Sequence, residues 1–129
     1  MSIRGVARGL AICAVGTLAT GGVTSLASSI AWRLTGTDWL YSHHGPILVM
    51  AAFLGGWAGG TTVTAFWPEV RVALAIAGPA IFWAFLFASP NPWLRGMPLA
   101  WVESLAAVAG ALFGWMGWRQ LRRSAAGTK

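Results

Sequence analysis

Four apolar runs separated by short polar stretches dominate the chain, and they cover residues 10–31, 46–66, 70–88 and 98–118. Each run is close to the roughly 20 residues that a helix needs to cross the hydrocarbon core of a bilayer. Because the connections are short, consecutive helices are expected to lie side by side in opposite directions. The pattern therefore predicts an all-α membrane protein: a single integral membrane domain over residues 1–129, with four transmembrane helices in an up-down antiparallel bundle and a basic tail over residues 119–129.

The first run follows Arg4 and Arg8 and has some features of a cleaved signal peptide. Its small and polar residues, however, fall on one broad side of a helix, and its larger apolar residues fall on the other. That division is typical of a span that packs against neighbouring helices. We therefore expect the first run to be retained as a transmembrane helix.

Small residues recur four positions apart in the second and fourth runs, a pattern that lets membrane helices approach closely. The predicted helix-packing residues are Gly55, Gly56, Gly59, Gly60, Ala106, Gly110 and Gly114. In the second run they form two ladders, Gly55 with Gly59 and Gly56 with Gly60. Two ladders predict two close helix neighbours, which favours contacts with helices outside the chain.

Two prolines bear on the predicted helices. Pro46 is expected to begin the second helix, because proline is favoured in the first helical turn; a polar connection over residues 32–45 would precede it. Pro79 follows Gly78 in the middle of the third run, where the missing backbone N–H is expected to kink the helix.

The composition agrees with a membrane location. Hydrophobic residues make up 57% of the chain and charged residues only 9%, whereas soluble domains carry about 25% charged residues. The net charge is +6, and a basic balance in such an apolar chain indicates membrane orientation, with no indication of nucleic acid binding. One side of the predicted bundle holds Arg4, Arg8, Arg71, Arg119, Arg122, Arg123 and Lys129, and the other holds only Arg33 and Arg95. The positive-inside rule therefore places both termini in the cytoplasm of a multi-pass inner-membrane protein.

Glu103 is the one acid in the fourth run, and it lies on the same helical side as the small residues. A carboxylate inside a span is costly unless it is paired or hydrated, so Glu103 is expected to face protein or a cavity. It is a candidate proton or cation site. The alternative is a structural partner for Arg95, Arg33 or a hydroxyl group of the first span.

A polar cluster is predicted on the outer side of the membrane, close to Glu103. Its members are Arg33, Asp38, His43, His44 and Arg95. His43 and His44 are weak metal or haem candidates, because adjacent side chains point in different directions and no other histidine is present. No sequence motif indicates a cofactor, and no catalytic residues are identified.

These observations favour a non-catalytic structural or accessory subunit that packs through small-residue helix faces within a larger membrane complex. Its partners would be the lipid bilayer and either other membrane subunits or further copies of itself. A first alternative is a small homo-oligomeric proton- or cation-coupled transporter that uses Glu103. In size and layout the chain resembles small multidrug-resistance transporters, but their first span carries an essential acid and this one has none. A second alternative is a redox, metal- or haem-binding subunit that uses His43 and His44.

Overall fold

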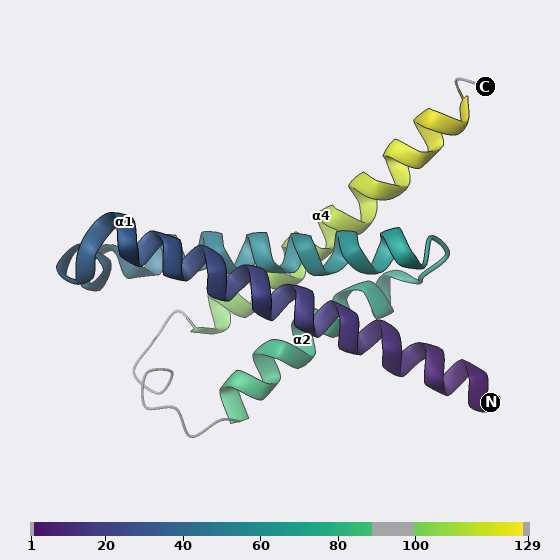
Figure 1. Ribbon diagram of the computed structural model, residues 1–129, viewed down its shortest axis with the longest axis horizontal. Coiled ribbons are helices and arrows are strands. Elements are labelled where there is room, and N and C mark those ends of the chain that lie inside the picture. The colour runs from purple at the N-terminus through teal and green to yellow at the C-terminus, as the bar shows by residue number, and fades with distance from the viewer. Residues whose placement is uncertain (1, 89–99, 128–129) are drawn as a thin grey trace.

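The structure is a computed structural model that describes residues 2–88 and 100–127, apart from the side chains of residues 35–45 and 100. Within these residues all regular secondary structure is α-helical. The helices are α1 (Ile3–Phe66), α2 (Val72–Ala88) and α4 (Ala100–Gly127) (Figure 1). The predicted all-helical fold is thus confirmed.

Helix α1 folds back on itself, so that its two ends form two long arms that lie side by side (Figure 1). We call Ile3–Leu34 the first arm and Pro46–Phe66 the second arm. The backbone stays helical between them, where the sequence predicts a polar connection. The prediction that Pro46 begins a helix is therefore wrong. Pro46 lies inside α1, where it removes one backbone hydrogen bond without ending the helix.

A tight turn over residues 67–71 joins the second arm to α2. The N–H of Trp67 donates to the carbonyl oxygen of Val63 (2.9 Å), and the N–H of Val70 donates to the carbonyl oxygen of Trp67 (2.9 Å). Helix α2 then begins at Val72, two residues after the start of the predicted run. The turn brings α2 back along α1.

Two pairs of helical segments run in the same direction: the first arm with α2, and the second arm with α4. The residue numbers of contacting pairs increase together along both helices. The pairs are Gly16 with Gly78, Gly21 with Phe82, Gly56 with Ala107, and Gly60 with Ala111. The first arm is therefore parallel to α2, and the second arm is parallel to α4. The two arms of α1 are antiparallel, because Gly59 contacts Thr20 and Gly55 contacts Thr24.

Two small hydrophobic clusters form the described core. Ile12, Val63, Val70 and Ala75 join both arms of α1 to the turn and to α2. Ala52, Trp83 and Ala107 join the second arm, α2 and α4. Each cluster contains residues from different elements, so the interior is shared by the whole described chain.

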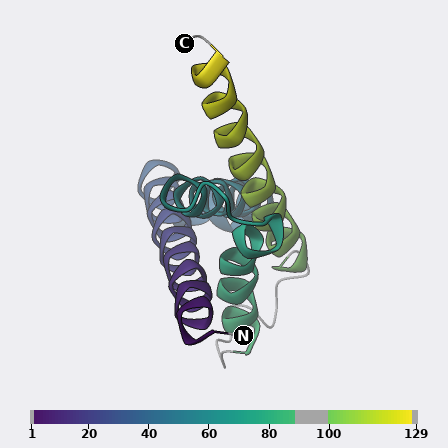
Figure 2. The same cartoon turned by 90° about the vertical axis from the view of Figure 1, so that its right-hand side faces the viewer.

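The two arms of α1 are long and apolar enough to cross a membrane. Helix α2 is apolar but shorter, with 17 residues. Helix α4 continues through Gly127, nine residues beyond the predicted span, and its end projects from the rest of the molecule (Figure 2). This extension contains arginine, glutamine, leucine and alanine without proline, and these residue types favour helix.

Candidate functional site

The two glycine ladders of the second arm face two different helices. Gly55 and Gly59 lie against the first arm, where a Cβ atom on Gly55 would meet the backbone oxygen of Thr20 at 2.8 Å. Gly56 and Gly60 lie against α4, where a Cβ atom on Gly60 would meet the Cα atom of Ala111 at 2.8 Å. Since real Cβ atoms essentially never come so close, larger residues at these positions would separate the helices.

Helix α4 also contributes glycines to its contact with the second arm. A Cβ atom on Gly110 would lie 2.8 Å from the backbone nitrogen of Trp57, and one on Gly114 would lie 2.6 Å from the hydroxyl of Thr61. Gly110 and Gly114 are buried, whereas Ala106 is half-buried at the edge of the contact. The second arm and α4 therefore touch backbone to backbone over several turns.

Both neighbours of the doubled ladder thus belong to this chain: the first arm and α4. Each of the two ladders has one helix neighbour, and both neighbours are helices of the same chain. The inference from the ladders to helices outside the chain is therefore not supported. A third close contact, between Gly16 and Gly78, joins the first arm to α2, where a Cβ atom on Gly78 would lie 2.6 Å from the Cα atom of Gly16.

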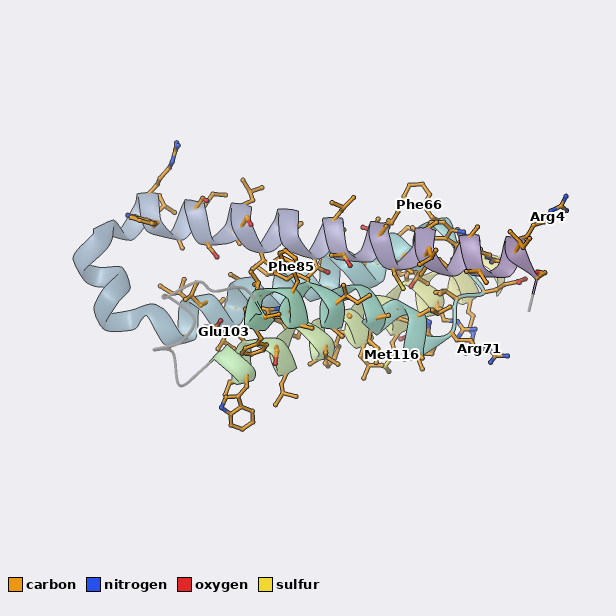
Figure 3. The ribbon with its side chains drawn as sticks, turned by 90° about the horizontal axis from the view of Figure 1, so that it is seen from below. Arg4, Phe66, Arg71, Phe85, Glu103 and Met116 are labelled. Carbon is orange, nitrogen blue, oxygen red and sulfur yellow. The ribbon has the colours of Figure 1, made fainter. Side chains whose placement is uncertain are left out.

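Glu103 is buried near the start of α4, with only 3% of its surface exposed. It lies one turn before Ala107, on the face that packs against the second arm. Within the described residues, its Oε1 atom has no hydrogen-bond partner. Figure 3 shows Glu103 far from Arg4 and Arg71, which both lie near the opposite end of the molecule.

A second buried polar group belongs to the same region. Trp83 of α2 is 5% exposed and packs in one cluster with Ala107. Its indole nitrogen has no hydrogen-bond partner in the described part of the chain. Burying a polar group without a hydrogen bond costs about 1–3 kcal/mol, and an ionised carboxylate costs more. Packing alone does not account for an acid at position 103.

Four threonines with buried hydroxyl oxygens differ in how these hydroxyl groups are satisfied. Thr20 donates to the carbonyl oxygen of Gly16, and Thr64 donates to that of Gly60, both at 2.7 Å. These bonds to the preceding turn satisfy the hydroxyls without a ligand. The hydroxyl oxygens of Thr24 and Thr61 have no partner among the described residues. They lie at the contacts of Gly55 and Gly114.

Most of the predicted outer-face cluster lies outside the described side chains. This applies to Asp38, His43, His44 and Arg95, while Arg33 is exposed on the first arm. Over residues 2–34, 46–88 and 101–127, no three histidine, cysteine, aspartate or glutamate side chains come together as metal ligands. The metal or haem interpretation of His43 and His44 remains a prediction.

Two tryptophans that matter in the structure, Trp83 and Trp115, are not candidate site residues by sequence pattern. Trp83 lies inside an apolar run, and that position was a signal, since interfacial tryptophans are expected at the ends of spans. Trp115 donates from its indole nitrogen to the carbonyl oxygen of Val70, at 3.0 Å. No sequence signal pairs Trp115 with Val70, which are 45 positions apart.

The chain matches no family model, and no curated protein or solved structure shows significant similarity to it.

Proposed function

We propose that this chain is a small multi-pass protein of the cytoplasmic membrane, with four spans, that acts as a non-catalytic packing subunit of a larger membrane assembly. Two helices have the length and apolar character of a span. Helices α2 and α4 pack alongside them, and large apolar side chains are exposed on every element. Examples are Leu10, Leu18, Leu54, Phe85, Leu105 and Phe113. Such an outer surface suits contact with lipid or with other membrane helices.

The distribution of charge supports an orientation with both ends in the cytoplasm. Arg4 and Arg71 lie near the same end of the molecule (Figure 3). The extension of α4 adds Arg119, Arg122 and Arg123, and Arg122 reaches the carbonyl oxygen of Ala65 near the end of the second arm. Basic residues collect on the cytoplasmic side of membrane proteins, so this end is assigned to the cytoplasm.

The observation that carries the packing role is the backbone contact between the second arm and α4. The glycines that would leave space for a passage are covered by neighbouring backbone, as at Gly56 with Ala107 and Gly60 with Ala111. The second arm and α4 therefore leave no passage between them along these turns. A chain packed in this way contributes to an assembly through its outer surface.

The outer side of α4 is the part of that surface best suited to another helix. Trp101, Leu105, Phe113 and Met116 are all more than half exposed. Phe113 contacts Phe53 of the second arm, with ring centroids 6.0 Å apart, which extends the face onto a second helix. Aromatic residues and methionine are enriched where proteins contact one another.

Gentle extraction in a membrane-active polymer, followed by mass spectrometry, tests the packing role. We expect foreign membrane subunits to co-purify in fixed ratio with the wild-type chain. A Leu105→Ala/Phe113→Ala variant should lose them while remaining folded. As a matched control, Leu10→Ala/Leu18→Ala removes two exposed apolar side chains from the first arm and should retain them. Recovery of the wild-type chain alone would contradict the proposal.

A second candidate function rests on Glu103, because a packing subunit does not require a buried acid whose Oε1 atom has no hydrogen-bond partner among the described residues. In this alternative the carboxyl group exchanges a proton or binds a cation in a transporter formed by several copies. Proton-coupled uptake in vesicles should then be lost in Glu103→Gln. Glu69→Gln, which changes an exposed acid in the turn, should leave it intact. Equal uptake by the wild-type chain and Glu103→Gln would remove Glu103 from any transport mechanism.

A further inference from the structure

A pocket of about 250 Å³ opens at the basic end of the molecule, between the first arm and the turn before α2. Arg8 and Gly9 line it from the first arm, and Glu69, Arg71 and Leu74 line it from the other side. The first arm leaves this space open because a Cβ atom on Gly9 would meet nothing within 4 Å. The pocket is separate from the glycine contacts and from Glu103.

The pocket has an apolar floor and a charged rim. Ile12, which is 2% exposed, and Leu74 supply apolar surface. Arg8, Glu69 and Arg71 are exposed at the rim. A phospholipid has the same division, since its charged headgroup adjoins a glycerol and acyl region.

The two arginines suit a phosphodiester. Guanidinium groups bind phosphate oxygens through paired N–H donors. Arg71 also directly precedes the start of α2 at Val72, and the positive end of a helix dipole favours an anion there. The two cations come from separate elements, so a bound phosphate would connect the first arm to the turn.

Glu69 narrows the choice of headgroup. Its carboxylate lines the same pocket as the two arginines. An acid in this position disfavours a headgroup that carries only negative charge, and it attracts an ammonium group. We therefore propose that the pocket binds a phospholipid headgroup of the phosphoethanolamine class, with the phosphodiester at Arg8 and Arg71 and the ammonium at Glu69.

This inference rests on the proposed membrane location and not on the subunit role. Native mass spectrometry of the full chain in detergent separates the two, because lipid binding is measured there without any foreign subunit. The probes are dioleoyl phosphatidylethanolamine, phosphatidylglycerol and phosphatidylcholine, and inorganic phosphate alone. We expect one phosphatidylethanolamine to bind in preference to the other probes.

Variants that change charge test the roles assigned to Arg8, Arg71 and Glu69. Arg8→Gln/Arg71→Gln should weaken phosphatidylethanolamine binding by about tenfold or more, as expected for loss of charge-assisted hydrogen bonds. Arg4→Gln/Arg123→Gln removes the same charge from arginines that do not line this pocket. It should change binding by no more than about twofold, because exposed charges contribute little. Glu69→Gln should shift the preference from phosphatidylethanolamine toward phosphatidylglycerol.

Gly9→Leu fills the pocket without changing charge, so it keeps the proposal falsifiable if the arginine variants do not fold. It should abolish binding at unchanged thermal stability. Equal losses in the two double arginine variants would overturn the proposal, because they would show a general charge effect. Binding of inorganic phosphate with the same dependence on Arg8 and Arg71 would overturn it too. An unchanged headgroup preference in Glu69→Gln would remove the assigned role of that residue and the headgroup class with it.

Discussion

The indole nitrogen of Trp115 donates a 3.0 Å hydrogen bond to the carbonyl oxygen of Val70. Val70 lies in the turn between the second arm and α2, so this bond fastens α4 to the point where the other elements meet. The guanidinium of Arg119 lies 4.8 Å from the centre of the Trp115 ring. Arg122 reaches the carbonyl oxygen of Ala65 at 3.5 Å. Helix α4 is thus held by polar contacts at its basic end and by glycine contacts along its length.

Replacing Trp115 with phenylalanine should destabilise the protein by about 1 kcal/mol, because it removes the hydrogen bond to Val70 while keeping an aromatic ring. Thermal unfolding in detergent measures the change. Trp101→Phe is the matched control, since Trp101 is 62% exposed. If both variants unfold at the same temperature, the hydrogen bond does not contribute to stability.

Gly56→Ala should cost about 1–3 kcal/mol, because the new methyl group meets the backbone of Ala107 and overpacks the contact. Gly22→Ala makes the same change where a Cβ atom would meet nothing within 4 Å. It should be neutral or stabilise by up to about 1 kcal/mol, since alanine favours helix over glycine. Unfolding in mixed micelles with increasing sodium dodecyl sulfate compares the two. Equal effects would argue against a tight contact at Gly56.

Glu103→Gln should increase stability, because it removes a buried ionisable group whose Oε1 atom has no partner in the described part of the chain. We expect a gain of about 1 kcal/mol in the same unfolding assay. Glu69→Gln, in the exposed turn, should change stability by less than about 0.5 kcal/mol. A clear loss of stability in Glu103→Gln would instead reveal a favourable interaction of the acid in the native protein.

The proposed topology predicts which positions a membrane-impermeant thiol reagent can label. In a Cys13→Ala background, cysteines at positions 2 and 126 should react from the cytoplasmic side. A cysteine at position 34 should react from the opposite side, because Leu34 is 80% exposed at the far end of the first arm. Labelling of positions 2 and 34 from one side would rule out a first arm that crosses the membrane.

The predicted helix-packing faces depend on residue size. Gly56, Gly60, Gly110 and Gly114 were identified because four-residue spacing places small residues on one side of a helix. The same spacing does not say which helix fills that side. The neighbour of Gly56 is Ala107 because α4 runs parallel to the second arm, and residue spacing does not encode that direction.

The helix ends were harder to predict because local signals compete there. Pro46 follows a polar stretch and is a good helix start by itself, yet the backbone remains helical through it. The charge of the stretch after Trp118 predicts a tail, but charge does not prevent helix formation, and α4 continues to Gly127. The burial of Glu103 was expected from its place on the small-residue side, whereas its lack of a described partner could not be predicted from spacing.

The pairing of parallel helices has a consequence for the order in which the protein is made. The second arm is complete once Phe66 has been synthesised, but the partner of its Gly56 and Gly60 side begins only at Ala100. In the proposed membrane topology, this glycine surface is therefore made before its final neighbour. Until α4 has been added, this surface is open to a helix of another protein.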